Sequence, residues 1–282
     1  MIKTSNELME KEINKTVSEN VINTEDNTEE IDYDAVCPVC NEHLFLPPKK
    51  LFNRVHRFRV MCKCERDEEE KQKQEKALYE HKKRVKELKL DCFEFKSSQN
   101  CTFENDNGLN PKMDVAKKYV EKWNSLENAQ GGLLLIGKVG TGKTYMAAAI
   151  ANGLLEQEVT VKMTDFISIG NDIFNASDKN AVVKKLVGYD LLIIDDLGVE
   201  RKTEFSLEYI FKVIDERVNS GKPMIVTTNL NIDTMNTDND QMLKRIYDRI
   251  CSVCLAVDVD GPNIREIKTM TQIETVSNTL NG

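Results

Sequence analysis

The sequence reads Gly137-Lys138-Val139-Gly140-Thr141-Gly142-Lys143-Thr144 in the stretch that decides its fold. These residues match the phosphate-loop pattern G-x-x-x-x-G-K-T at every fixed position. An apolar run at 133–136 precedes the loop, and a helix-forming stretch at 145–151 follows it. A strand, a glycine loop and a helix in this order are the context in which the pattern binds a nucleoside triphosphate. The sequence therefore predicts ATP as a ligand.

The chemistry of phosphate binding assigns a role to each part of this loop. Its glycines allow backbone N–H groups to turn toward the phosphates, and the following helix N-terminus adds partial positive charge. Lys143 is expected to reach the β- and γ-phosphates, and the Thr144 hydroxyl to bind Mg²⁺. The predicted nucleotide-binding residues of this segment are Gly137, Lys138, Val139, Gly140, Thr141, Gly142, Lys143, Thr144 and Tyr145.

Two acidic residues, Asp195 and Asp196, directly follow a second apolar run at 191–194. Such a run is typical of a parallel strand buried on both faces, and active sites lie at the carboxyl ends of these strands. We expect Asp195 to hold Mg²⁺ together with Thr144, and Asp196 to orient the attacking water. Asn229 lies just after the next predicted strand, where it is expected to hydrogen-bond the γ-phosphate or that water.

Composition limits the classes of protein that remain. The chain has 282 residues and a formal net charge of −8, so it is not a basic nucleic-acid coat, and any DNA contact must be local. No apolar stretch approaches the ~20 residues of a membrane-spanning helix, and the N-terminal residues lack the apolar core of a signal peptide. We therefore expect a cytoplasmic protein without a membrane partner, whose eight cysteines form no disulfide framework.

Four regions follow one another along the chain. Residues 1–35 form an acidic tail or docking helix, 36–66 a zinc-binding module, 67–97 a charged helical linker, and 98–282 the ATPase domain. Within the last region, apolar runs at 133–136, 159–163, 191–194, 224–227 and 253–257 are separated by helix-length segments. This alternation predicts an α/β fold in which a parallel sheet is flanked by helices.

The zinc prediction rests on two close cysteine pairs, Cys37–Cys40 and Cys62–Cys64. Four thiolates in this arrangement suit tetrahedral Zn²⁺, and so short a segment needs a metal to fold. Because the second pair is C-x-C, His43 or His56 remains an alternative ligand.

The combination of motifs resembles AAA+ ATPases, and its finer pattern is similar to bacterial and phage helicase loaders of the DnaC/DnaI type, which are related to IstB. The resemblance extends over roughly residues 35–268. The stretches that carry it, besides the phosphate loop and the two later strands, are Asn100-Cys101-Thr102-Phe103-Glu104, Ile214-Asp215-Glu216-Arg217, Arg245-Ile246-Tyr247-Asp248-Arg249 and Asn263-Ile264-Arg265.

This resemblance implies roles that single motifs do not. Arg249 matches the arginine finger that such ATPases insert into a neighbouring subunit's site, with Arg245 as the second choice, and Arg265 matches a terminal nucleotide-sensing arginine. Members assemble into open rings or spirals and carry no C-terminal helical lid. They contact single-stranded DNA from the region that here is 164–190, where Phe166, Phe174, Lys179, Lys184 and Lys185 are candidates.

The resemblance implies a loader that places the hexameric replicative DNA helicase onto single-stranded DNA, using ATP, Mg²⁺ and a zinc module. ATP hydrolysis is expected to be slow and completed by a neighbouring subunit. Two alternatives stay open: an IstB-type transposition ATPase acting on duplex DNA, and an ATP-gated protein adaptor that does not touch DNA.

Overall fold

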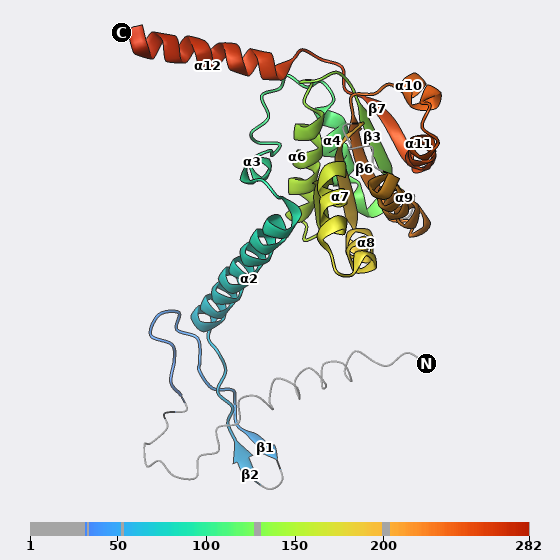
Figure 1. Cartoon of the computed structure of the whole chain (residues 1–282). Coiled ribbons are helices and arrows are strands. Elements are labelled where there is room, and N and C mark those ends of the chain that lie inside the picture. The colour runs from blue at the N-terminus through green and yellow to red at the C-terminus, as the bar shows by residue number, and fades with distance from the viewer. Residues whose placement is uncertain (1–31, 33, 52–53, 127–130, 199–203, 282) are drawn as a thin grey trace. The chain divides into compact units, whose positions relative to one another are not determined.

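The computed structural model describes residues 32, 34–51, 54–126, 131–198 and 204–281 of the chain (Figure 1). The chain divides into two compact units, Met1–Lys76 and Ala77–Gly282. Most of the predicted docking segment 1–35 lies outside the described residues. None of the helices in the described ranges is long and apolar enough to cross a membrane.

The second unit is built on a parallel sheet of five strands in the order β4-β5-β6-β3-β7. The strands are β3 (Gly132–Ile136), β4 (Val161–Asp165), β5 (Leu191–Leu197), β6 (Met224–Thr228) and β7 (Cys254–Asp258). The five predicted strands and their parallel arrangement are thus confirmed. In the spatial order, β6 lies between the phosphate-loop strand β3 and the aspartate strand β5, so the polar ends of these three strands meet at one edge.

Helices cover both faces of this sheet, as Figure 1 shows. One face packs against α4 (Met113–Glu121) and α6 (Lys143–Leu155). The other packs against α7 (Phe166–Asn175), α8 (Lys179–Gly188), α9 (Glu204–Asn219) and α11 (Gln241–Val253). Successive strand residues point to opposite faces, which explains why the strands read as continuous apolar runs.

Shorter elements and one long helix complete this unit. The short helices are α3 (Lys96–Gln99), α5 (Trp123–Leu126) and α10 (Ile232–Thr237). After β7 the chain forms α12 (Ile264–Asn281), whose residues beyond Ile264 are exposed. The sequence analysis expected little structure beyond Arg265, so this single helix is an addition to the predicted fold.

The first unit contains a small hairpin and the start of a charged helix. Strands β1 (Lys49–Leu51) and β2 (Arg54–His56) pair antiparallel. The predicted charged helix is present as α2 (Lys63–Cys92), and the boundary between the two compact units falls within it, after Lys76. The functional division of the chain at residues 66 and 97 stays a prediction.

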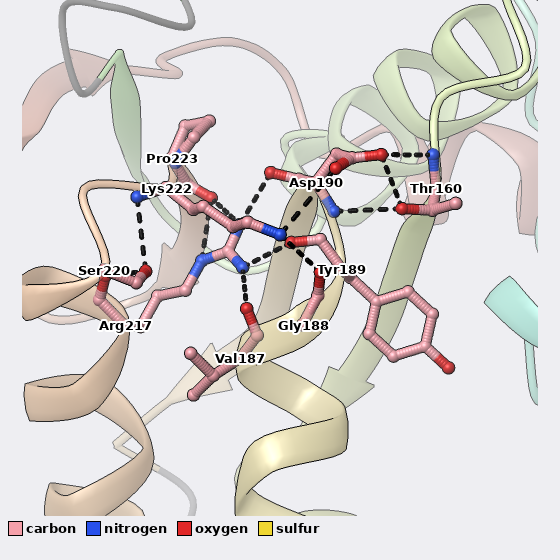
Figure 2. A network of polar contacts seen from close by, with 9 residues as sticks. All are labelled: Thr160, Val187, Gly188, Tyr189, Asp190, Arg217, Ser220, Lys222 and Pro223. Atoms are coloured by element: carbon pink, nitrogen blue, oxygen red, sulfur yellow. Dashed lines mark hydrogen bonds and ion pairs between the residues drawn. The ribbon is translucent and has the colours of Figure 1, made fainter.

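A fully buried arginine ties together the edge of the sheet opposite the phosphate loop (Figure 2). Arg217 of α9 donates five hydrogen bonds, to the carbonyl oxygens of Val187, Tyr189, Asp190 and Pro223. These carbonyls precede β5 and β6, so the guanidinium fixes where both strands begin. Burial lowers the pKa of Arg217 to about 10, which still leaves the side chain charged at neutral pH.

Candidate functional site

The phosphate loop has the backbone conformation that its glycines make accessible. Gly140 and Gly142 have φ angles of +85° and +94°, in the left-handed region that other residues rarely adopt. A Cβ atom on Gly140 would lie 1.9 Å from the Asn263 Oδ1 atom. The Ile264 N–H donates to the Gly140 carbonyl oxygen at 2.9 Å. The loop is therefore held by the segment that enters α12.

Lys143 is buried beneath the loop, with only 5% of its surface exposed. Its ammonium group donates to the carbonyl oxygens of Gly137 and Lys138, both at 2.8 Å, and to the Asn229 Oδ1 atom at 2.7 Å. All three acceptors are neutral, and burial lowers the lysine's pKa. The lysine thus has hydrogen bonds but no anionic partner among them, which suits it to bind phosphate oxygens.

Thr144 and Asp195 lie together at the carboxyl edge of the sheet. The Thr144 hydroxyl donates to Asp195 Oδ1 at 3.1 Å, and the Thr227 hydroxyl donates to the same oxygen at 2.5 Å. Burial raises the pKa of Asp195, while both hydroxyls oppose this shift. A hydroxyl and a carboxylate at this separation fit the oxygen donors that Mg²⁺ prefers.

Asp196 has an unusual backbone conformation that changes its direction. Its φ angle is +54°, and the pairing of β5 with β6 shifts register between Ile194 and Leu197. The Asp196 N–H donates to the Thr227 hydroxyl at 3.0 Å. Asp195 is half-buried, whereas Asp196 is exposed and lines the pocket at the phosphate loop. A bulge at an active-site edge is a recurrent way to aim a side chain, and it costs backbone strain.

A pocket of about 370 Å³ opens over these groups. Among the predicted site residues, its walls include Val139, Gly140, Gly142, Lys143, Thr144, Tyr145, Asp196, Asn229 and Arg265. The sequence analysis missed six further lining residues: Asn105, Asp106, Asn107, Asn110, Ile264 and Lys268. Lys268 follows Arg265 by three residues on α12, so a helix prediction for this segment would have placed both side chains on one face.

Arg249 and Arg245 lie away from this pocket, on α11. The Arg249 Nε atom is 2.9 Å from Asp215 Oδ1, and the arginine side chain is 44% exposed. Arg245 stacks over the Phe211 ring, 4.4 Å from its centroid. Neither arginine reaches the nucleotide pocket of its own chain, as a residue that acts on a neighbouring subunit requires.

One of the candidate DNA contacts proves unsuitable. Phe166 is only 2% exposed, because it begins α7 and packs into the hydrophobic core. Lys184 and Lys185 are exposed, and Lys185 pairs with Asp91 at 3.7 Å. Phe174 is 73% exposed. The lysines of α8 thus remain the better candidates.

The four predicted zinc ligands converge in the first unit. The sulfur atoms of Cys37, Cys40, Cys62 and Cys64 all lie within 4.8 Å of one another. Neither His43 nor His56 belongs to this group among the described residues, so the alternative that a histidine replaces a cysteine is wrong. His56 instead stacks on Phe58, with ring centroids 6.3 Å apart.

The surroundings of the sulfurs fit a divalent cation. Backbone hydrogen bonds from Glu42 and Cys64 lower the pKa of the Cys40 thiol to about 6. The hydrogen bond with Cys40 is the largest of several causes that raise the pKa of Cys64 to about 12. Four thiolates cannot share so small a space without a positive charge between them, and tetrahedral Zn²⁺ with ~2.3 Å sulfur bonds supplies it.

Comparisons with known proteins agree with this geometry. The chain is 30% identical over 161 residues to the replicative helicase loader DnaC of Escherichia coli strain K12, a match over 54% of this chain and 63% of that protein. It is 28% identical over 152 residues to the phage-like element PBSX protein XkdC of Bacillus subtilis strain 168, covering 51% of this chain and 57% of XkdC. The chain thus spans less than two thirds of the length of these relatives.

Solved structures share the fold. The crystal structure of DnaI matches with a TM-score of 0.52 and 21% identity, over 61% of this chain and 95% of that chain. The crystal structure of the DnaC helicase loader matches with a TM-score of 0.50 and 20% identity, over 59% of this chain and all (100%) of that chain. The pattern of the IstB-like ATP binding proteins matches residues 67–272. This chain therefore belongs to the IstB-like ATP binding protein family.

Proposed function

We propose that this protein is an ATP-dependent loader that places a hexameric replicative DNA helicase onto single-stranded DNA. The observation that carries the proposal is the meeting of Lys143, Asn229 and the Thr144–Asp195 pair at one edge of the sheet. It occurs in a chain of an ATP-binding family that is similar to DnaC, a replicative helicase loader. A cytoplasmic location accompanies this function.

The residues of the pocket divide the work on ATP among them. Lys143 would exchange its bonds to loop oxygens for bonds to the β- and γ-phosphates. Thr144 and Asp195 would hold Mg²⁺, which offsets phosphate charge when it is bound. Asp196 is aimed into the pocket by its bulge and would orient the attacking water, while Asn229 would hydrogen-bond that water or the γ-phosphate.

Hydrolysis would be completed between subunits of an open ring or spiral. Arg249 is half-exposed, so a neighbouring copy can reach it after it leaves Asp215. Its planar guanidinium would then stabilise the charge that develops on the γ-phosphate. Arg265 lines the pocket of its own chain, at the start of α12, and would respond to the bound nucleotide there.

The first unit would bind the helicase. Its four-cysteine cluster would hold Zn²⁺, because a segment this small does not bury enough surface to fold by itself. Ion pairs between Arg66 and Glu42, at 3.0 Å, and between Arg59 and Glu65 surround the cluster. The metal would thereby keep a docking surface in one shape.

A transposition ATPase is the second candidate, because the family pattern that matches this chain bears the name IstB-like. Such an ATPase would bind duplex DNA and assist a transposase. The charges do not separate the two candidates, since both need a local cationic surface on an acidic chain. The DNA preference does, because a loader holds single strands.

The test is light scattering after size-exclusion chromatography of the full chain mixed with the replicative helicase of its host. We expect a complex larger than the hexamer that forms with ATP and Mg²⁺ and weakens when Lys143→Met removes nucleotide binding. The double variant Cys62→Ser/Cys64→Ser should lose both zinc and the complex. One zinc per chain, released to a colorimetric chelator, is the matching measurement for the intact protein.

Three outcomes of these mixtures are decisive. A complex with the helicase and a preference for single-stranded over duplex DNA supports the loader. No complex, together with tighter binding to duplex DNA, supports the transposition ATPase. Binding to neither DNA at low salt would leave the ATP-gated adaptor, since electrostatic DNA contacts are strongest there.

A further inference from the structure

Asn110 is a buried polar residue in the wall of the nucleotide pocket that no motif identifies. It lies on the loop before α4 and is only 6% exposed. Its Oδ1 atom accepts a hydrogen bond from the Lys112 N–H at 2.9 Å, which fixes the orientation of the amide. The oxygen therefore faces its own loop, and the amide nitrogen Nδ2 is turned the other way.

The amide nitrogen has almost no partner. Within the described residues, its contact is with the Met146 sulfur at 4.0 Å, the outer limit for a hydrogen bond to sulfur. Thioether sulfur is a weak acceptor, whereas a buried amide N–H without a good acceptor costs about 1–3 kcal/mol. A side chain held in this way at a pocket is suited to donate to a ligand.

The surroundings indicate which part of a nucleotide this ligand group belongs to. A Cβ atom placed on Gly142 would lie 3.2 Å from the Ile264 side chain and 3.4 Å from Asn110 Nδ2. Asn110 and Ile264 therefore flank the last glycine of the loop, while Lys143, Thr144, Asp196 and Asn229 form the charged part of the pocket.

This side of the pocket combines apolar walls with one oriented donor. Ile264 and Val139 offer apolar surface, and Val139 is 57% exposed. Flat apolar ligand groups bind to such surfaces, and a few placed polar groups give them specificity. A nucleobase has this form, with apolar faces and hydrogen-bonding atoms along its edge.

We propose that Asn110 is a base-reading residue, whose amide N–H donates to an unprotonated ring nitrogen of the adenine of ATP. The inference rests on nucleotide binding at the phosphate loop, which is part of the proposed function. Adenine carries three such acceptors, N1, N3 and N7, and an oriented amide donor can satisfy one of them. A site built around a donor discriminates against an analogue that lacks the acceptor, because the donor then stays unpaired.

The test measures the dissociation constants of the full chain for ATP and for its 1-deaza, 3-deaza and 7-deaza analogues by calorimetry with Mg²⁺. Each analogue replaces one ring nitrogen by C–H. We expect the wild-type chain to bind one of the three roughly three- to tenfold more weakly than ATP, as for one neutral hydrogen bond. Asn110→Ala should bind ATP more weakly by the same factor and no longer distinguish that analogue from ATP.

Two further variants separate a contact with the base from an effect on folding. Asn110→Asp retains the acceptor for the Lys112 N–H but has no N–H to donate, so it should also lose the discrimination. Lys143→Ala should weaken ATP and all three analogues equally, since it acts on the phosphates. Thermal unfolding of each variant checks that the fold is intact.

The outcomes separate this inference from the proposed function. Wild-type protein that binds ATP and all three analogues equally well would overturn the base contact but leave nucleotide binding standing. Undiminished discrimination in Asn110→Ala and Asn110→Asp would overturn it as well, because another group would then read the base. A wild-type chain that binds no ATP would overturn nucleotide binding itself, and the inference with it.

Discussion

Lys143 and Arg217 are both buried cations whose hydrogen bonds go to neutral oxygens, and they lie at opposite edges of the same sheet. Arg217 uses all five of its N–H donors on backbone carbonyls (Figure 2). Lys143 has two carbonyls of its own loop and the side chain of Asn229 as partners, and it lines a pocket. Burial lowers the pKa of both residues.

The difference between them shows how to tell a structural cation from a ligand-binding one. The Arg217 carbonyls belong to the chain just before β5 and β6 and cannot be exchanged without moving those strands. The Lys143 acceptors lie on a loop and at a strand end beside a pocket, so phosphate oxygens can take their place. Burial and pKa alone do not distinguish the two; the partners and the access to a pocket do.

The largest effect on stability is expected for Arg217→Met. Methionine fills similar space but leaves buried carbonyl oxygens without donors, at about 1–3 kcal/mol for each. We expect the free energy of unfolding to fall by about 3 kcal/mol or more, measured by denaturant titration. The matched control is Lys212→Met on the same helix, whose side chain is 42% exposed and which should change stability by less than about 1 kcal/mol. Equal effects in both variants would contradict the structural role of Arg217.

Arg249→Ala adds a half-exposed cation to the comparison. We expect little loss of stability, under about 1 kcal/mol for the pair with Asp215, and unchanged ATP affinity. Phosphate release by the assembled protein should fall by roughly 10³-fold, the lower range for an arginine finger. Mixing Arg249→Ala subunits with Lys143→Met subunits should restore part of the rate if the arginine acts across an interface. Normal hydrolysis by Arg249→Ala alone would move the assignment to Arg245.

Lys143→Met tests the other side of the comparison. Loss of a charged donor to phosphate should weaken ATP binding by about 1.5–3 kcal/mol, which is roughly ten- to 150-fold in the dissociation constant. The stability of the fold should change by less than about 1 kcal/mol, because a buried charge is replaced by an apolar side chain of similar length. Calorimetric titration with ATP and denaturant unfolding give the two numbers. A large loss of stability would place Lys143 with Arg217 as a structural cation.

The smallest effect is expected for Lys222→Met, within the Arg217 network itself. Lys222 lies 3.8 Å from Asp190 Oδ1 and also donates to the Gly188 carbonyl, but its side chain is 39% exposed. Water can replace this donor, so we expect less than about 1 kcal/mol in the denaturant experiment. A change as large as that of Arg217→Met would show that burial is not what separates the two donors.

Much of the fold could be predicted from the chain alone, because buried parallel strands leave continuous apolar runs. All five predicted strands are present, each with bounds shifted by a few residues at most. The cysteine cluster was equally readable, since two close pairs can converge on one metal. The histidine alternative and the DNA contact at Phe166 were wrong because sequence spacing does not show which way a side chain faces.

Other parts of the site have no local signal. Asn110 and Lys268 come from segments on either side of the sheet-forming region, and only packing brings them to the same pocket. The bulge that exposes Asp196 while Asp195 stays half-buried is a register shift against β6, which two adjacent aspartates do not announce. The direct bond between Lys143 and Asn229 likewise depends on which strand lies next to β3.

The sequence by itself determined the α/β fold, the phosphate loop and the four-cysteine cluster, because hydrophobic periodicity and short fixed spacings are local properties of a chain. Only the tertiary structure decided the strand order that brings Asn229 to Lys143, the direction of Asp196, and the partners that make Arg217 structural. Those features depend on contacts between residues far apart in sequence, and such contacts are set by the packing of the whole domain.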